Sequence, residues 1–254
     1  MALPVTVPAT IPADAVDRLA TGEIELVGRM PNASNATFLV TLRDADADAD
    51  ADGAGGEPYA VAIYKPVRGE RPLWDFPPGL HLREVAAYRL SATAGLDVIP
   101  PTVLRPDAPL GEGSLQWFVN ADFSEHYFSL AERSELREQF RALALLDVLA
   151  NNTDRKSGHC LYEPAAQRVW GIDNGLCFSL DARLRTVIWE FAGDPLDTRL
   201  RAVAAGLAEC LPPDVAELLD ADEAAAISER AARLAARGTF PHDRSGRGYP
   251  WPLI

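Results

Sequence analysis

The chain has 254 residues, of which 48% are hydrophobic, and this is enough to build one large core or two smaller ones. Its formal net charge of −13 argues against broad nucleic-acid binding and against electrostatic attachment to anionic lipid. Three cysteines without a C-x-x-C spacing favour neither a disulfide framework nor a zinc site, and are typical of a reduced, intracellular protein. The N-terminus does not resemble a signal peptide, and no apolar run of about 18 residues occurs, so we expect a cytoplasmic protein without stable membrane insertion.

The first half of the chain predicts a small, mostly β-structured region. A short helix precedes three strands, and a longer helix that ends at Gly95 precedes a further strand pair. The predicted helices are 12–20 and 81–95, and the predicted strands are 23–30, 36–42, 59–65, 99–104 and 114–119. The segment D-A-D-A-D-A-D-A-D-G-A-G-G-E (44–57) has the composition of a disordered acidic insertion.

The second half of the chain is predicted to be mostly helical. The segment 134–150 places four apolar side chains on one helical face, and 220–238 begins after an aspartate cap and ends at a glycine. Between these helices, 160–163 and 168–173 predict a short strand pair. The fold class is therefore α+β, with a β-rich N-lobe over 1–119 and a mostly helical C-lobe over 120–254.

Three features of the first half could contact phosphate groups. The polar turn P-N-A-S-N (31–35) lies between two predicted strands, so backbone N–H groups near Ser34 and Asn35 could bind phosphate oxygens. Lysine is rare here, with 22 arginines to two lysines, and Lys65 ends a predicted strand, where its ammonium would emerge at the mouth of a sheet. Glu84 lies near the start of the following helix. A strand Lys paired with a helix Glu is how many kinases hold the lysine on the α- and β-phosphates.

Two loops gather rare residue types. The segments N-N-T-D-R-K-S-G-H (151–159) and G-I-D-N-G-L-C-F (171–178) contain three of the six asparagines and one of the two lysines. Asp154 could orient a hydroxyl nucleophile or accept its proton, while Arg155 and the neighbouring lysine offset phosphoryl charge. Asp173 ends an apolar strand, and a carboxylate at such a turn suits Mg²⁺. The alternative is that N-T-D and D-N-G are ordinary turn formers.

Taken together, these segments resemble the phosphatidylinositol 3-/4-kinase-like superfamily, and most closely the type II phosphatidylinositol 4-kinases. The resemblance covers roughly residues 24–195, and the compact chain points to the bacterial (actinobacterial) branch. The motifs that carry it are R-E-V-A-A-Y-R-L-S-A-T-A-G-L-D-V-I-P-P-T-V-L (83–104), G-S-L-Q-W-F-V (113–119), N-T-D-R (152–155) and I-D-N-G-L-C-F (172–178).

The resemblance implies a bilobal, protein-kinase-like fold and a set of site residues. Lys65, with Glu84 as its partner, would contact the phosphates of ATP, and the stretch 114–120 would present backbone groups to the adenine. Asp154 would be the acid of the catalytic loop and Asp173 the principal Mg²⁺ ligand. The nucleotide-binding set is therefore Ser34, Asn35, Lys65, Glu84, Gln116, Phe118 and Val119, the catalytic set is Asp154, Lys65 and Arg155, and the metal ligands are Asp173 and His159.

The chain departs from the family pattern at two points. The family loop reads N-T-D-R-x-x-x-N, and here His159 stands in the place of the last asparagine. An imidazole can ligate a metal but favours softer ions than Mg²⁺, which makes Mn²⁺ an alternative cofactor. The cysteine-rich palmitoylation stretch of the type II lipid kinases is also absent from the sequence.

The sequence therefore predicts an ATP- and Mg²⁺-dependent phosphotransferase that transfers the γ-phosphate to a hydroxyl acceptor. The acceptor is left open among a phosphoinositide, a protein and a soluble small molecule. Two other readings stay open. One is a catalytically weak or inactive pseudokinase that serves as a nucleotide-binding scaffold, which the histidine at position 159 favours. The other is an enzyme that transfers AMP to protein.

Overall fold

The computed structural model describes residues 7–31, 35–43 and 59–253. The expected acidic insertion, 44–57, and Ser34 lie outside these residues. The chain divides into two compact units, the first made of Met1–Val85 with Pro100–Asn120 and the second of Ala86–Ile99 with Ala121–Ile254. Each unit is described by itself.

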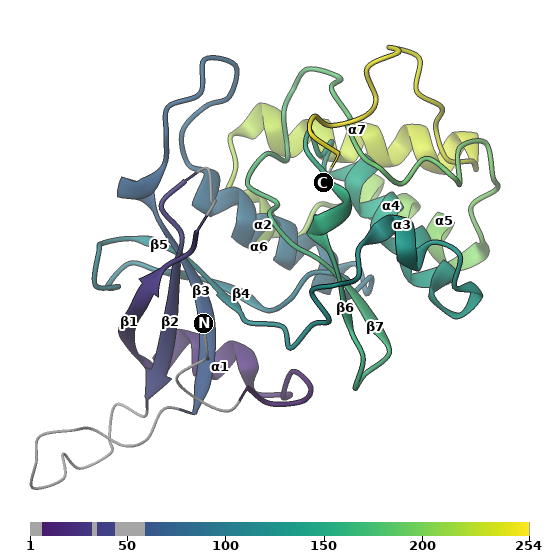
Figure 1. Cartoon of the computed structure of the whole chain (residues 1–254). Helices are drawn as coiled ribbons and strands as arrows, with labels where there is room; N and C mark the ends of the chain where they lie inside the picture. The colour runs from purple at the N-terminus through teal and green to yellow at the C-terminus, as the bar shows by residue number, and fades with distance from the viewer. Residues whose placement is uncertain (1–6, 32–34, 44–58, 254) are drawn as a thin grey trace, which may run out of the picture. The chain divides into compact units, whose positions relative to one another are not determined.

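The first unit contains a five-stranded antiparallel sheet with the strand order β1-β2-β3-β5-β4 (Figure 1). The predicted pairing of the first two strands and of the last two is confirmed. Between these pairs, β3 joins β2 to β5, which are far apart in the sequence. The strands are β1 (Glu23–Arg29), β2 (Phe38–Arg43), β3 (Ala60–Pro66), β4 (Thr102–Arg105) and β5 (Gly113–Trp117).

The core of the first unit lies between this sheet and a short helix, α1 (Ala15–Thr21). Leu19 from the helix packs with Tyr64 of β3 and Trp117 of β5, and all three are buried. Strand β3 is central in the sheet, and this explains its run of apolar residues, because a strand covered on both faces does not alternate in polarity. Lys65 lies near the end of this strand, as predicted.

Helix α2 (Leu80–Thr93) follows β3 after a loop that begins with the single turn η1 (Val67–Gly69). It begins one residue before its predicted start, and Gly95 follows it with a positive φ of 64°. A positive φ favours glycine, which has no Cβ to clash with the preceding turn. The division between the two units falls within this helix, after Val85.

The second unit is mostly helical. Its longest helix is α7 (Ala221–Arg237), which packs along α5 (Thr198–Glu209), with α4 (Arg137–Leu149) also against it (Figure 1). Helix α7 begins with a capping box between Asp220 and Glu223 and ends at Gly238, where φ is 68°. Two shorter helices are α3 (Tyr127–Leu130) and α6 (Pro213–Ala216), and the turn η2 (Ser134–Leu136) precedes α4.

The predicted strand pair in the second unit is present as the antiparallel hairpin β6 (Cys160–Glu163) and β7 (Arg168–Gly171). The turn η3 (Ser157–His159) leads into it from α4. The segment before the hairpin and the segment after it are the two polar loops of the sequence. Among the residues that the structure describes, no helix combines the length and apolar character needed to cross a bilayer.

Candidate functional site

The strand lysine and the helix glutamate are brought together in the first unit. The Nζ atom of Lys65 donates a hydrogen bond to Oε1 of Glu84 and forms an ion pair with it. The carboxylate is almost completely buried, whereas about a fifth of the lysine side chain (22%) remains exposed. A buried carboxylate is stable only when it is paired, so Glu84 holds the ammonium at a fixed place while leaving it accessible.

The other nucleotide-binding candidates of the first unit are engaged in the sheet and its loops. The side chain of Asn35 accepts a hydrogen bond from the backbone N–H of Arg71 at 3.0 Å. Gln116 is buried in β5, and its side chain donates to Oγ1 of Thr102 at 2.9 Å. The backbone N–H of Phe118 donates to the carbonyl of Val61 at 3.1 Å. This N–H therefore continues the sheet, whereas the sequence predicts that backbone groups of 114–120 face an adenine.

Val119 directly follows and is buried. The contact between its backbone groups and the adenine of ATP stays a prediction. Ser34 lies outside the described residues, so its predicted contact with phosphate also stays a prediction.

In the second unit, local hydrogen bonds explain why the residues N-T-D follow one another at 152–154. Oδ1 of Asn152 accepts from the backbone N–H of Asp154 at 2.9 Å, which closes a tight turn around the intervening threonine. Thr153 then joins the other loop, because both its backbone N–H and its hydroxyl donate to the carbonyl of Leu176, at 3.0 and 2.9 Å. These residues fix the backbone on which Asp154 stands.

Asp154 is partly exposed, and Oδ2 of its carboxylate lies 3.2 Å from Nζ of Lys156. Burial raises the pKa of Asp154 above its ordinary value, the positive charge of Lys156 opposes this rise, and the negative charge of Asp173 adds to it. The two aspartates of the sequence motifs are therefore electrostatic neighbours. A carboxylate with a raised pKa is a stronger base, as a group that accepts a hydroxyl proton requires.

Asp173 begins the second loop at a φ of 58°, in the left-handed region where aspartate and asparagine are the best tolerated residues after glycine. About half of its side chain (53%) is exposed, and its Oδ2 lies 3.4 Å from Nε2 of His159. The other ring nitrogen of His159 lies 3.0 Å from the carbonyl oxygen of Asp154. The histidine thus links the two aspartates.

Arg155 has a different role from the one predicted. Its side chain is completely buried, so it cannot face a phosphate group as a free cation. It forms a buried ion pair with Asp147 of α4, with Nη2 3.0 Å from Oδ1. The same guanidinium donates to the carbonyl of Ile172 and to Oδ1 of Asn174, both at 2.6 Å. Arg155 therefore fastens α4 to the residues on either side of Asp173, and acts as a positioning group.

Asp147 is the site residue that the sequence reading missed. Its carboxylate also accepts from the side chains of Asn152, at 3.0 Å, and Thr186, at 3.1 Å. The signal was present, because L-L-D-V-L places a single acid within an apolar stretch of a predicted helix. A charge in such a position is stable only with a buried partner.

The sequence was compared with protein-family models and with known proteins. No family model matches the sequence. The protein Rv2133c of Mycobacterium tuberculosis (strain ATCC 25618 / H37Rv) is 35% identical to the chain, in an alignment that covers 93% of this chain and 94% of that protein. The chain belongs to the Rv2133c family.

Two solved structures show the fold of this Rv2133c-family chain. The Golgi casein kinase with Mn/ADP bound has a TM-score of 0.52 at 13% identity, over 95% of this chain and 80% of that one. The hydra Fam20 structure with sugar has a TM-score of 0.51 at 13% identity, over 87% of this chain and 86% of the other. The predicted kinase-like α+β fold is therefore confirmed.

Proposed function

We propose that this chain is an ATP- and divalent-metal-dependent phosphotransferase that transfers the γ-phosphate to a hydroxyl acceptor. We further propose that residues 1–119 and 120–254 correspond to the two lobes of a kinase. The kinase-like fold and the fact that one structural neighbour was solved with Mn/ADP support this proposal. Fold alone does not imply an activity, so the argument depends on particular side chains.

The observation that carries the proposal is the ion pair between Lys65 and Glu84. The chain has 37 acidic residues, and the glutamate near the start of the following helix pairs with the strand lysine. In kinases this pair holds the lysine on the α- and β-phosphates of ATP. Lys65 would have that role here, because it is fixed by a buried partner and still accessible.

In the second unit, Asp173 and His159 fit a divalent metal ion. A ligating histidine usually directs its second ring nitrogen to a carbonyl or carboxylate, and His159 has this arrangement, with the carbonyl of Asp154 on Nδ1 and Asp173 at Nε2. Within residues 7–31, 35–43 and 59–253, no set of three or more His, Cys, Asp or Glu side chains could hold a metal. The other ligands would therefore be phosphate oxygens and water, as is usual for Mg²⁺.

The metal would neutralise charge on the phosphates, and Asp154 would align the hydroxyl of the acceptor and accept its proton. Two observations support this role: the turn at Asn152 fixes the backbone of Asp154, and Lys156 beside it contributes positive charge. The imidazole at position 159 favours Mn²⁺ over Mg²⁺ relative to an oxygen ligand.

Two finer proposals concern the relationship and the acceptor. The resemblance to type II phosphatidylinositol 4-kinases, and the mycobacterial relative, support an origin in an actinobacterial branch of that superfamily. The charge of −13 and the missing palmitoylation stretch favour a protein or a soluble small molecule as acceptor, and a cytoplasmic location.

The test is calorimetric binding of ATP, together with turnover and self-labelling from γ-labelled and α-labelled ATP, each with Mg²⁺ or Mn²⁺. The wild-type chain is expected to bind ATP only with metal and to release or transfer the γ-label. Asp173→Asn is expected to lose the metal-dependent part of ATP binding, because an amide oxygen is a much weaker ligand than a carboxylate. Asp222→Asn, at an exposed aspartate of α7, is the matched control and should behave as wild type.

The outcomes separate the candidate functions. Metal-dependent binding without turnover would identify a nucleotide-binding pseudokinase scaffold. Incorporation of the α-label into protein would identify AMP transfer instead of phosphorylation. Absence of ATP binding with either metal would contradict the proposed function altogether.

A further inference from the structure

A buried histidine in the first turn of α2 lies between two carboxylates. Nδ1 of His81 is 2.9 Å from Oε1 of Glu70, in the loop before the helix, and Nε2 is 3.0 Å from Oε1 of Glu112, which precedes β5. The histidine is 4% exposed. All three residues belong to the first unit and lie outside the residues proposed for phosphate transfer.

The geometry determines the protonation state of His81. A carboxylate only accepts hydrogen bonds, and a neutral imidazole has one N–H, so an imidazole with a carboxylate on each nitrogen is bonded on both sides only when it is protonated. Burial alone would lower the pKa of His81, but the hydrogen bonds to Glu70 and Glu112 outweigh it and raise this pKa. Burial likewise opposes the charged form of Glu70, but hydrogen bonds from the His81 side chain and from backbone N–H groups lower its pKa to about 2.

The same bridge fixes the beginning of α2. Besides contacting the imidazole, the carboxylate of Glu70 accepts the backbone N–H groups of Gly79, at 3.0 Å, and His81, at 2.9 Å. These N–H groups have no partner within the helix, so an acceptor from another segment serves as an N-cap, and a negative charge there is favoured by the helix dipole. Glu84 is three residues after His81, on the same side of the helix, and is also buried. The turn held by His81 therefore carries the partner of Lys65.

We propose that His81 is a positioning residue, whose imidazolium bridge to Glu70 and Glu112 holds the first turn of α2 so that Glu84 stays on Lys65. The catalytic rate is therefore expected to fall reversibly as the pH rises and the bridge loses its proton. This inference rests on the proposed function, because it gives that function a pH dependence.

The direction of the pH dependence follows from the two pKa values. A folded-state pKa raised above the unfolded value means that the contribution of His81 is fully present below the ordinary histidine pKa and is lost as the pH rises through the folded value. The contribution of Glu70 is present above the ordinary glutamate pKa and is lost as the pH falls toward 2. The bridge is thus complete between the ordinary pKa of glutamate and the ordinary pKa of histidine. Other charged groups around the turn are Arg83 and Glu84 on α2, Lys65 on β3, and Arg68, whose Nε lies beside Gly111.

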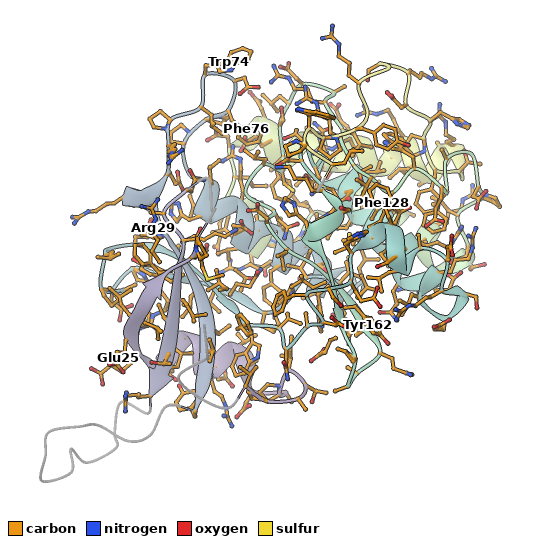
Figure 2. All side chains as sticks on the ribbon, viewed as in Figure 1. Glu25, Arg29, Trp74, Phe76, Phe128 and Tyr162 are labelled. Atoms are coloured by element: carbon orange, nitrogen blue, oxygen red, sulfur yellow. The ribbon has the colours of Figure 1, made fainter. Side chains whose placement is uncertain are left out.

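The decisive variant is Glu112→Gln. The Glu112 side chain is 45% exposed, so the fold should tolerate the change, while the imidazolium loses one of its two negative partners. The pKa of His81 is then expected to fall, and the alkaline limb of the rate profile to move to lower pH. At the pH where the wild-type chain retains half of its maximal rate, the variant should have lost most of its activity. The control is Glu25→Gln, at an exposed carboxylate on the edge strand β1 (Figure 2), which should leave the limb unchanged.

One readout of this test, the pKa of His81 itself, does not depend on the proposed function. The chain has only four histidines, so an NMR titration of the ring resonances gives the pKa of His81 directly. An ordinary pKa for His81 would overturn the imidazolium bridge. A pKa that falls in Glu112→Gln without any movement of the rate profile would overturn the positioning role alone. If the wild-type chain does not bind ATP in the presence of either metal, the proposed function is contradicted, and so is the positioning role that rests on it.

Discussion

Replacing Asp154 by asparagine is expected to lower the rate of phosphoryl transfer by about 10²- to 10⁴-fold while ATP binding stays close to that of wild type. The amide cannot accept a proton from the hydroxyl of the acceptor, and this step is made only in the transition state, so kcat should fall and KM should change little. The substitution keeps the shape of the side chain and leaves the turn at Asn152, which depends on the Asp154 backbone, unaltered. The measurement is initial rate with γ-labelled ATP, beside calorimetric binding of ATP.

A second carboxylate in the same unit provides the control for this prediction. Asp181→Asn changes an exposed aspartate whose side chain pairs with Arg183, and it should keep the wild-type rate. If Asp154→Asn and Asp181→Asn had the same rate, Asp154 would not be the proton acceptor. Loss of ATP binding in Asp154→Asn would instead assign this carboxylate to the metal or the nucleotide.

Replacing Arg155 by methionine is expected to destabilise the protein by about 3–5 kcal/mol, because it leaves the carboxylate of Asp147 buried without its charged partner. Both side chains are essentially inaccessible to solvent, so water cannot replace the lost hydrogen bonds. The measurement is the free energy of unfolding from denaturation by urea. Methionine fills a similar apolar volume, so the effect reports the lost charge and hydrogen bonds more than a cavity.

The matched control is Arg233→Met on α7, where Arg233 forms an ion pair with Glu229 and both side chains are largely exposed. Exposed pairs contribute little, so this variant should lose less than about 1 kcal/mol. A loss in Arg155→Met no greater than that in the control would show that the buried pair does not hold the two loops. The double variant Arg155→Met with Asp147→Leu should recover part of the lost stability, because it removes the unpaired charge.

The fold could be predicted where its determinants are local. Helix α7 begins and ends within one residue of its prediction, because Asp220, Glu223 and Gly238 all lie at its ends and act on their own neighbours. The segment 134–150 was predicted as one helix, and its first three residues form a separate turn before α4. The pairing of β3 with β5 could not be predicted, because a loop, helix α2 and strand β4 separate these strands in the chain and no local signal specifies their contact.

In the candidate site, too, local features could be predicted from the sequence and long-range pairings could not. The sequence by itself determined the turns at N-T-D and D-N-G and the lysine near the end of its strand, because those features depend on residues a few positions apart. It did not determine which of many acidic residues pairs with Lys65, nor that His81 joins two carboxylates 11 and 31 residues away.

Arg155 and Lys156 are adjacent, and they show the difference between what the sequence determines and what only the tertiary structure decides. Both are cations in the same loop, and nothing in the letters R-K separates them. The tertiary structure buries Arg155 completely against Asp147 and leaves Lys156 partly exposed beside Asp154. Burial and ion pairing depend on which distant segments pack around a side chain, and only the folded chain decides that.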